Sequence, residues 1–221
     1  MLIVRGSGGN RPNVLLASHL VLHGYGHWLS NDPRGSASTE TRKPELRDLG
    51  EVHTGRRPQH EQPSKQELRG FYRRAEPLLQ FDPLWYRDRE RSLLADGLRA
   101  ALRQHGYTIW ACALCANHAH VVARAHRDRA DAIWHNRARA TAEAIRAAGI
   151  APPDHPVWSH RPYKVYLYTW QDVVDRVAYV EDNPGKERLP QQVWDFVQPL
   201  PKQCAGLVPR RKGIWDPRGR R

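Results

Sequence analysis

Tyr-Thr-Ile-Trp-Ala-Cys-Ala-Leu-Cys-Ala-Asn-His-Ala-His-Val-Val-Ala-Arg, at residues 107–124, is the stretch that decides the fold. It contains two apolar runs, Thr108–Leu114 and His118–Arg124, separated by the short interruption at residues 115–117. Apolar runs of this length on either side of a turn predict a β-hairpin.

The returning strand carries His118 and His120. Residues i and i+2 of a strand project from the same face, so both imidazoles can bind one divalent metal ion from a rigid element. One alternative is that one histidine belongs to the core and the other is exposed, since the chain has twelve histidines. Another is a zinc site, Cys112-x-x-Cys115-x-x-His118-x-His120, with Cys112 opposite His120 across a turn at 115–117.

The rest of the chain adds further strands and helices. Helices are expected from Asp82-Pro83 to His105, where Gly106 ends the helix, over Arg129–Ala148, and from Thr169 to Asn183-Pro184. Strands are expected at Val14–Leu22 and Tyr163–Tyr168. This order predicts an α+β, ferredoxin-like (split βαβ) fold with an antiparallel sheet of four to five strands and packed helices.

The distribution of polar residues predicts the domain organisation. We expect residues 1–13 to be disordered, 14–198 to form a single domain, and 199–221 to form a basic tail. Within the domain, residues 27–64 lack any sustained apolar period, which predicts a long loop or insertion.

The composition favours a polyanionic partner. The formal net charge is +12, which suits nucleic acid or an anionic membrane surface. No apolar run is long enough for a membrane span, so nucleic acid is the leading partner class. Three cysteines are an odd number and predict no disulfide framework, which fits the reducing cytoplasm. A basic RNA- or ribosome-associated module is the alternative that charge alone explains.

The last expected helix has two distinct faces. Its apolar stripe consists of Trp170, Val173, Val174, Val177 and Val180. Tyr179 falls on the opposite side with Asp172 and Asn183, where the main core does not need it. The simpler alternatives are that Tyr179 is an ordinary half-buried tyrosine and that Asn183 only ends the helix before Pro184.

Together these two regions resemble a known family, the single-tyrosine HUH transposases, and within it most closely the REP-associated, insertion-sequence-200-like group. The family has an apolar strand, a Met-Pro-Asn-like turn and His-hydrophobic-His, here Asn117-His118-Ala119-His120. A later helix carries Tyr-hydrophobic-x-x-Asn-Pro, here Tyr179-Val180-Glu181-Asp182-Asn183-Pro184. The resemblance spans residues 14–198 and includes segments 24–29 and 157–167. Cys115-Ala116 in place of Met-Pro and the small Ala119 are departures from the pattern.

The resemblance implies a metal-dependent transposase that nicks and rejoins single-stranded DNA at hairpin-bearing sites through a 5′-phosphotyrosine. Tyr179 would be the nucleophile, and His118 and His120 would hold catalytic Mg²⁺ or Mn²⁺ with Asn183 as third ligand. The DNA would carry a REP-like hairpin or inverted-repeat ends. We expect a monomer rather than a homodimer, acting at the nucleoid in the bacterial cytoplasm and not at a membrane.

DNA binding needs basic and aromatic side chains along the strand. The candidates are Trp28, Asn31, Asp32, Arg34, Arg124, Arg127, Arg129, Lys164, Arg210, Arg211 and Lys212. The alternative function is a catalytically silent, domesticated DNA-hairpin-binding protein, although a pure binder has no need of both histidines, the tyrosine and the asparagine together.

Overall fold

The computed structural model describes residues 3–4, 13–36, 38–41, 43–160 and 163–210. The chain forms two compact units. Unit 1 comprises residues 1–22, 86–153 and 161–221, and unit 2 comprises residues 23–85 and 154–160. That residues 14–198 form a single domain stays a prediction.

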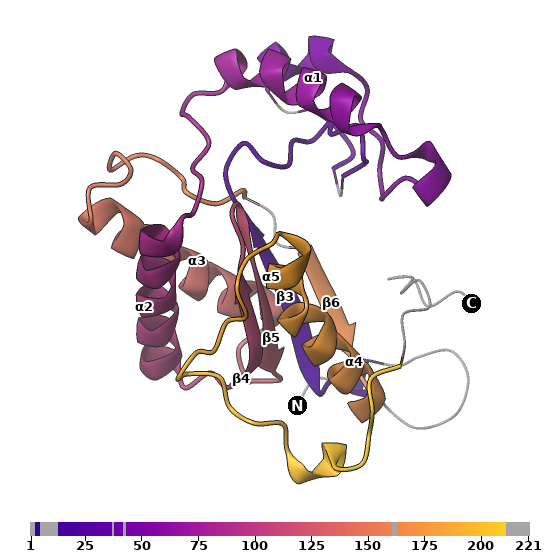
Figure 1. The fold of residues 1–221 in the computed structure, drawn as a ribbon, viewed down its shortest axis with the longest axis vertical. Coiled ribbons are helices and arrows are strands. Elements are labelled where there is room, and N and C mark those ends of the chain that lie inside the picture. The colour runs from indigo at the N-terminus through magenta and orange to yellow at the C-terminus, as the bar shows by residue number, and fades with distance from the viewer. Residues whose placement is uncertain (1–2, 5–12, 37, 42, 161–162, 211–221) are drawn as a thin grey trace. The chain divides into compact units, whose positions relative to one another are not determined.

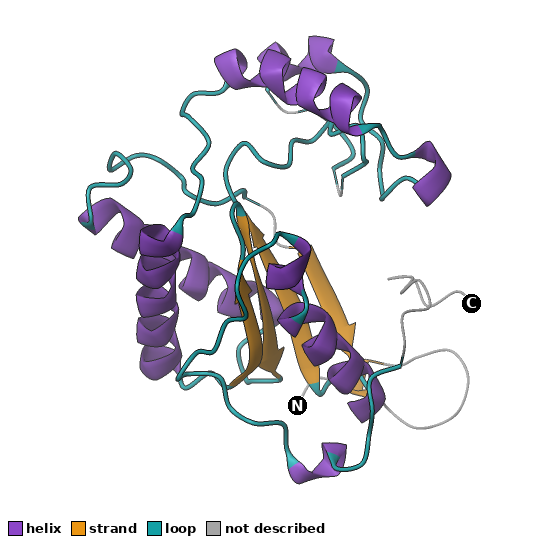
Figure 2. Cartoon of the chain, in the orientation of Figure 1, coloured by secondary structure: helices purple, strands orange, loops and turns teal. Residues whose placement is uncertain are grey.

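Unit 1 is built on a four-stranded sheet in the order β4-β5-β3-β6. Its elements follow one another as β3 (Ala17–His23), α2 (Asp88–His105), β4 (Ile109–Leu114), β5 (His118–Arg124), α3 (Ala130–Ala147) and β6 (Tyr163–Leu167). The ladders β4–β5 and β3–β6 are antiparallel. This βαββαβ sequence with the first strand between the third and the fourth is the ferredoxin-like arrangement, so the predicted α+β fold is confirmed (Figures 1 and 2).

Helices cover both faces of this sheet. Figure 1 shows α3 behind the sheet and α4 (Trp170–Glu181) in front of it. On the rear face the indole of Trp134 in α3 donates to the Val21 carbonyl of β3 (3.1 Å). On the front face α4 packs its valines against alternate, buried strand residues. The residues in that front core are Ala17, Trp110, Ala111, Ala113, Cys115, Val122, Val165, Leu167, Val173, Val177 and Val180.

Helices α2 and α3 approach each other closely at Gly97. A Cβ atom there would lie 2.7 Å from the Thr141 Cα and 2.8 Å from the Ala140 carbonyl oxygen. Both are backbone atoms, which cannot turn aside as a side chain can. The glycine therefore sets the distance between these two helices.

Several element boundaries differ from the prediction. Helix α2 begins at Asp88 rather than at Asp82-Pro83, because the Glu90 carboxylate accepts from the Arg87 N–H (2.8 Å) and fixes the first turn there. The Asp82 carbonyl instead accepts from the His155 ring within unit 2 (3.0 Å). Gly106 ends α2 in the left-handed conformation, as predicted.

The tyrosine-bearing helix ends differently from the prediction. It begins after the Thr169 cap as predicted but ends at Glu181, and Asn183–Lys186 form a short helix, α5. Pro184 lies in the first turn of α5, where a missing N–H costs nothing. Asn183 therefore begins a new helix instead of closing the old one.

Unit 2 contains more regular structure than a loop. Its elements are η1 (Pro44–Leu49), η2 (Gln59–Glu61), α1 (Lys65–Ala75) and η3 (Glu76–Leu78). The first two lie inside the predicted loop, and α1 was not predicted from the sequence. Its signal is the capping box, in which Ser64 accepts from the Glu67 N–H and Glu67 from the Ser64 N–H.

The ends of the chain are described only in part. Strand β1 (Ile3–Val4) pairs with β2 (Asn13–Val14), and the remainder of the predicted disordered segment 1–13 lies outside the described residues. The tail contains η4 (Lys202–Cys204), and residues 211–221 also lie outside. Among the described helices, none is long and apolar enough to cross a membrane.

We expect Gly97→Ala to lower the free energy of unfolding by about 1–3 kcal/mol, because the backbone of α3 must move to admit the methyl group. Urea denaturation followed by circular dichroism measures the change. The matched control is Gly70→Ala in α1, where the nearest neighbour of the new Cβ is the Arg74 guanidinium at 3.9 Å. The control should be neutral or stabilising by up to about 1 kcal/mol, and equal effects of the two substitutions would contradict the close approach.

Candidate active site

The β4–β5 hairpin determines which residues face α4. The Cys115 N–H donates to the His118 carbonyl (2.8 Å), which closes a two-residue turn at Ala116-Asn117. The register then pairs Ala113 with His120. Ala113 and Cys115 belong to the front core, so His118 and His120 project from the same face as these residues.

This register corrects the predicted geometry of the four-residue zinc site. Cys112 pairs with Val121, not with His120, so the Cys112 thiol lies on the opposite face of the sheet from the two imidazoles. Burial there raises the pKa of Cys112 to about 12. The prediction placed three residues in the turn, and the two-residue turn shifts every pair by one position.

A third histidine, His19 of β3, joins the pair. Its Nε2 lies 2.9 Å from His120 Nδ1, and the two rings stack with centroids 5.1 Å apart. Arg176 Nη1 of α4 lies 3.3 Å from His19 Nδ1. Both ring nitrogens of His19 are therefore held, and His19 fixes the orientation of the His120 ring.

Tyr179 projects from α4 toward these rings. Its ring centroid lies 5.9 Å from that of His120 and 6.0 Å from that of His19, and the His118 and His120 centroids are 4.8 Å apart. The tyrosine is 37% exposed, whereas His19 and His120 are buried. The structure thus brings together the predicted nucleophile and both predicted histidines, with the nucleophile open to solvent.

Two cations flank the Tyr179 ring. The Lys186 ammonium lies 4.1 Å from its centroid and the Arg176 guanidinium 5.1 Å from it. Burial is the largest influence on Arg176 and lowers its pKa. A partly desolvated guanidinium and a lysine beside one phenol favour an anionic ligand at this position.

Asn183 and Glu187 follow Tyr179 along the chain. The Asn183 amide donates to the Tyr179 carbonyl (2.5 Å), and its role as a metal ligand stays a prediction. Glu187 was not predicted as a site residue. Its Oε1 lies 3.6 Å from His118 Nδ1, and its Oε2 accepts from the Ala116 N–H (2.9 Å). No periodicity marks Glu187 in the sequence, because it lies beyond the break between α4 and α5.

Four of the residues predicted to bind DNA lie in unit 2, where two are buried and two are half-buried. Asp32, fully buried, pairs with Arg34 (2.7 Å) and accepts from the Tyr72 hydroxyl. Arg34 lies over the Trp28 ring, 3.9 Å from its centroid. The buried Asn31 amide donates to the Leu46 carbonyl (2.6 Å). These contacts stabilise the unit, and a DNA-binding role for these side chains stays a prediction.

The other described candidates for DNA binding belong to unit 1. Arg124, Arg127 and Arg129 are exposed, and Arg124 ends β5 about 20 Å from His118 at the usual rise per strand residue. Lys164 pairs with Asp131 (2.5 Å). Arg210 pairs with Asp172 (3.1 Å) and Asp175 (2.5 Å) at the start of α4. Arg211 and Lys212 lie outside the described residues.

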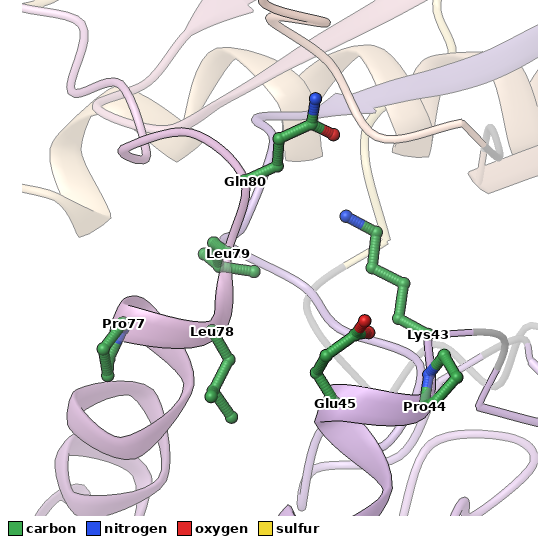
Figure 3. Close-up of a pocket in the computed structure, with 7 residues that line it drawn as sticks. All are labelled: Lys43, Pro44, Glu45, Pro77, Leu78, Leu79 and Gln80. Carbon is green, nitrogen blue, oxygen red and sulfur yellow. The ribbon is translucent and has the colours of Figure 1, made fainter.

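Unit 2 also contains a pocket, shown in Figure 3. Its lining residues are Lys43, Pro44, Glu45, Pro77, Leu78, Leu79 and Gln80. They come from η1 and from the segment around η3, and none of the predicted site residues is among them. The pocket is therefore separate from the histidine and tyrosine cluster.

The chain is similar to a solved structure but matches no family model. No curated protein matches it either. Among solved structures, the chain is similar to a REP-associated tyrosine transposase bound to a REP hairpin, with 14% identity over 86% of this chain and 81% of that chain and a TM-score of 0.42.

If His118 and His120 bind Mn²⁺ as predicted, His19→Ala should weaken that binding by about 10–100-fold, because a metal-binding histidine depends on the partner that orients its ring. Isothermal titration calorimetry measures the affinity. Ser18→Ala, at the neighbouring and equally buried position of β3, should leave it unchanged. Equal affinities of His19→Ala and the unaltered protein would show that the His19–His120 contact has no part in metal binding.

We expect Asp32→Ala to lower the free energy of unfolding by about 3 kcal/mol, because it leaves the Arg34 charge unpaired. Urea unfolding followed by tryptophan fluorescence measures the loss. The exposed Asp48 lies in η1 of the same unit, and Asp48→Ala should change stability by less than about 0.5 kcal/mol. If Asp32→Ala unfolds at the same urea concentration as the unaltered protein, the Asp32–Arg34 pair does not stabilise the unit, and a role of Asp32 in DNA contact would be favoured instead.

Proposed function

We propose that the chain is a metal-dependent transposase of the single-tyrosine HUH type, which nicks and rejoins single-stranded DNA at hairpin-bearing sites. The observation that carries the proposal is the convergence of Tyr179, His118 and His120 on one face of the sheet. The two sequence motifs that resemble this family contain the same three residues. A basic chain with cations beside the tyrosine suits a phosphodiester substrate.

The side chains at the site fit a divalent cation. His118 and His120 would hold it, and we propose Asn183 as the third protein ligand. Nitrogen and amide-oxygen donors suit Mn²⁺ as well as Mg²⁺. When bound, such an ion polarises the scissile phosphate and offsets the charge of the transition state.

The chemistry assigned to Tyr179 is nucleophilic. Its Oη would form a bond to the scissile phosphorus while the bond from phosphorus to the 3′-oxygen breaks, and the departing oxygen takes up a proton as the phenol loses one. Lys186 and Arg176 place positive charge next to the phosphate as it is transferred. The 5′-phosphotyrosine retains the phosphodiester energy, so attack by another 3′-hydroxyl rejoins the strand without ATP.

The proposed substrate is single-stranded DNA with a hairpin, such as a REP-like element or an inverted-repeat end. Exposed Arg124, Arg127 and Arg129 are proposed to contact its phosphates. Tyr179 lies beside the histidines of its own chain, and we propose that the protein acts as a monomer. We place the activity at the bacterial nucleoid in the cytoplasm.

We expect the protein to form a covalent adduct with labelled hairpin-bearing single-stranded DNA in the presence of Mn²⁺, and Tyr179→Phe to reduce adduct formation by at least about a thousandfold. Denaturing gel electrophoresis detects the adduct. Tyr166→Phe is the matched control, since Tyr166 is exposed on β6 to a similar degree (43%) and should leave the adduct intact.

Two outcomes would count against the proposal. An adduct that survives Tyr179→Phe would assign the nucleophile to another residue. Hairpin binding by the unaltered protein without any adduct would favour the silent hairpin-binding protein. If Tyr179→Phe still binds the hairpin, its failure to form the adduct reflects the missing nucleophile and not a failure to bind the DNA.

A further inference from the structure

We propose that Cys115, His118 and Glu187 form a second metal site, suited to Zn²⁺, which competes with the site at His118 and His120 for the shared imidazole. The existence of this zinc site does not depend on the proposed function. Its consequence, inhibition of DNA cleavage by zinc, does rest on that function.

Three donors converge at the tip of the hairpin. Cys115 and His118 lie opposite each other across the two-residue turn, which the Cys115 N–H closes by donating to the His118 carbonyl. Glu187 reaches the same place from the segment that follows α5. The thiol sulfur, an imidazole nitrogen and a carboxylate oxygen all lie within 4.8 Å of one another.

Two of the three donors are already held near the position that a metal ion would require, while His118 Nδ1 lies 2.8 Å from Asn117 Oδ1. The Ala116 N–H binds one oxygen of Glu187 (2.9 Å), which directs the other oxygen to 3.6 Å from His118 Nδ1. Cys115 is buried in the front core, so its side chain has little freedom. With bonds of about 2.0–2.3 Å to such ligands, zinc would draw the three donors together by shifts on the order of 1 Å.

The surroundings leave room for a fourth ligand. Cys115 is buried, His118 is intermediate and Glu187 is exposed, so the cluster opens to solvent on the Glu187 side. Three protein ligands with water in the fourth position satisfy the tetrahedral preference of zinc. The site needs no residue beyond those already assembled.

The donor set distinguishes this site from the proposed catalytic one. A thiolate with an imidazole and a carboxylate favours Zn²⁺, whereas Mg²⁺ prefers oxygen ligands and keeps several waters. The pair His118–His120 includes no sulfur. Zinc should therefore enter the Cys115 site in preference to Mg²⁺ or Mn²⁺.

Competition follows from the chemistry of His118. A neutral imidazole offers one nitrogen lone pair, because the other nitrogen carries its proton. His118 bound to zinc beside Cys115 therefore has no lone pair for a metal ion that it shares with His120. Only one of the two sites can hold a metal ion at a time while His118 is neutral.

Titration with Co²⁺ in the absence of DNA tests the site itself. We expect one equivalent to bind with a thiolate-to-metal charge-transfer band, and Zn²⁺ to remove the band by displacement. Cys115→Ser should abolish the band, and Glu187→Gln should weaken binding at least about tenfold. Cys112→Ser is the matched control, since that thiol is buried on the opposite face and should leave the band intact. No band, or a band that persists in Cys115→Ser, would overturn the proposed site.

Electron paramagnetic resonance of Mn²⁺ tests the competition without reference to cleavage. One equivalent of Zn²⁺ should release bound Mn²⁺ from the unaltered protein and from Cys112→Ser but not from Cys115→Ser. Retained Mn²⁺ at saturating zinc, or no Mn²⁺ binding at all, would overturn the competition even if the cobalt band is present.

The consequence for activity needs a separate assay. Zinc should inhibit Mn²⁺-dependent adduct formation at least about tenfold in the unaltered protein and not in Cys115→Ser. Equal inhibition of both proteins would contradict the inference. If neither protein forms the adduct without zinc, the result would count against the proposed function. The zinc site would then still be tested by the cobalt titration.

Discussion

The hydrogen bond from the Cys115 N–H to the His118 carbonyl is the contact on which the site depends. It sets a two-residue turn, and the turn sets the register of the whole hairpin. Side chains alternate along a strand, so a slip of one residue would turn His118 and His120 toward α3 and away from Tyr179. The same bond places Cys115 beside His118. One backbone contact thus decides which thiol and which imidazoles share a face.

Helix α4 depends on this face in turn. Its valines are buried among the alternate residues of the sheet, which fixes the rotation of the helix about its own axis. That rotation leaves Tyr179 over the imidazoles and brings Arg176 to His19. Burial disfavours the charged form of a guanidinium and therefore lowers the pKa of Arg176. An anion bound at the tyrosine would offset part of this cost, so the helix is more favourably placed with a phosphate present.

Sequence periodicity accounts for much of this arrangement. Strand β5 has the predicted bounds, and the apolar stripe of α4 and the cap at Thr169 are where the pattern places them. The contact of His19 with His120 could not be predicted in this way, because it arises from the order of strands in the sheet. The register was also ambiguous, since a Cys-Ala-Asn-His turn has no glycine to indicate its length. Helical spacing placed Asn183 near Tyr179 but could not show that its amide binds the Tyr179 carbonyl.

The ion pairs at Lys164 and Arg210 bear on how the protein responds to ionic strength. Each cation is already neutralised by a carboxylate of the same chain. Binding to a polyanion weakens with salt in proportion to the number of phosphates that the protein neutralises, because those phosphates release their counterions. A cation held by its own carboxylate contributes little to that release. If the protein binds a nucleic acid as proposed, the dependence of that binding on salt will thus be shallower than the 35 lysine and arginine residues would imply.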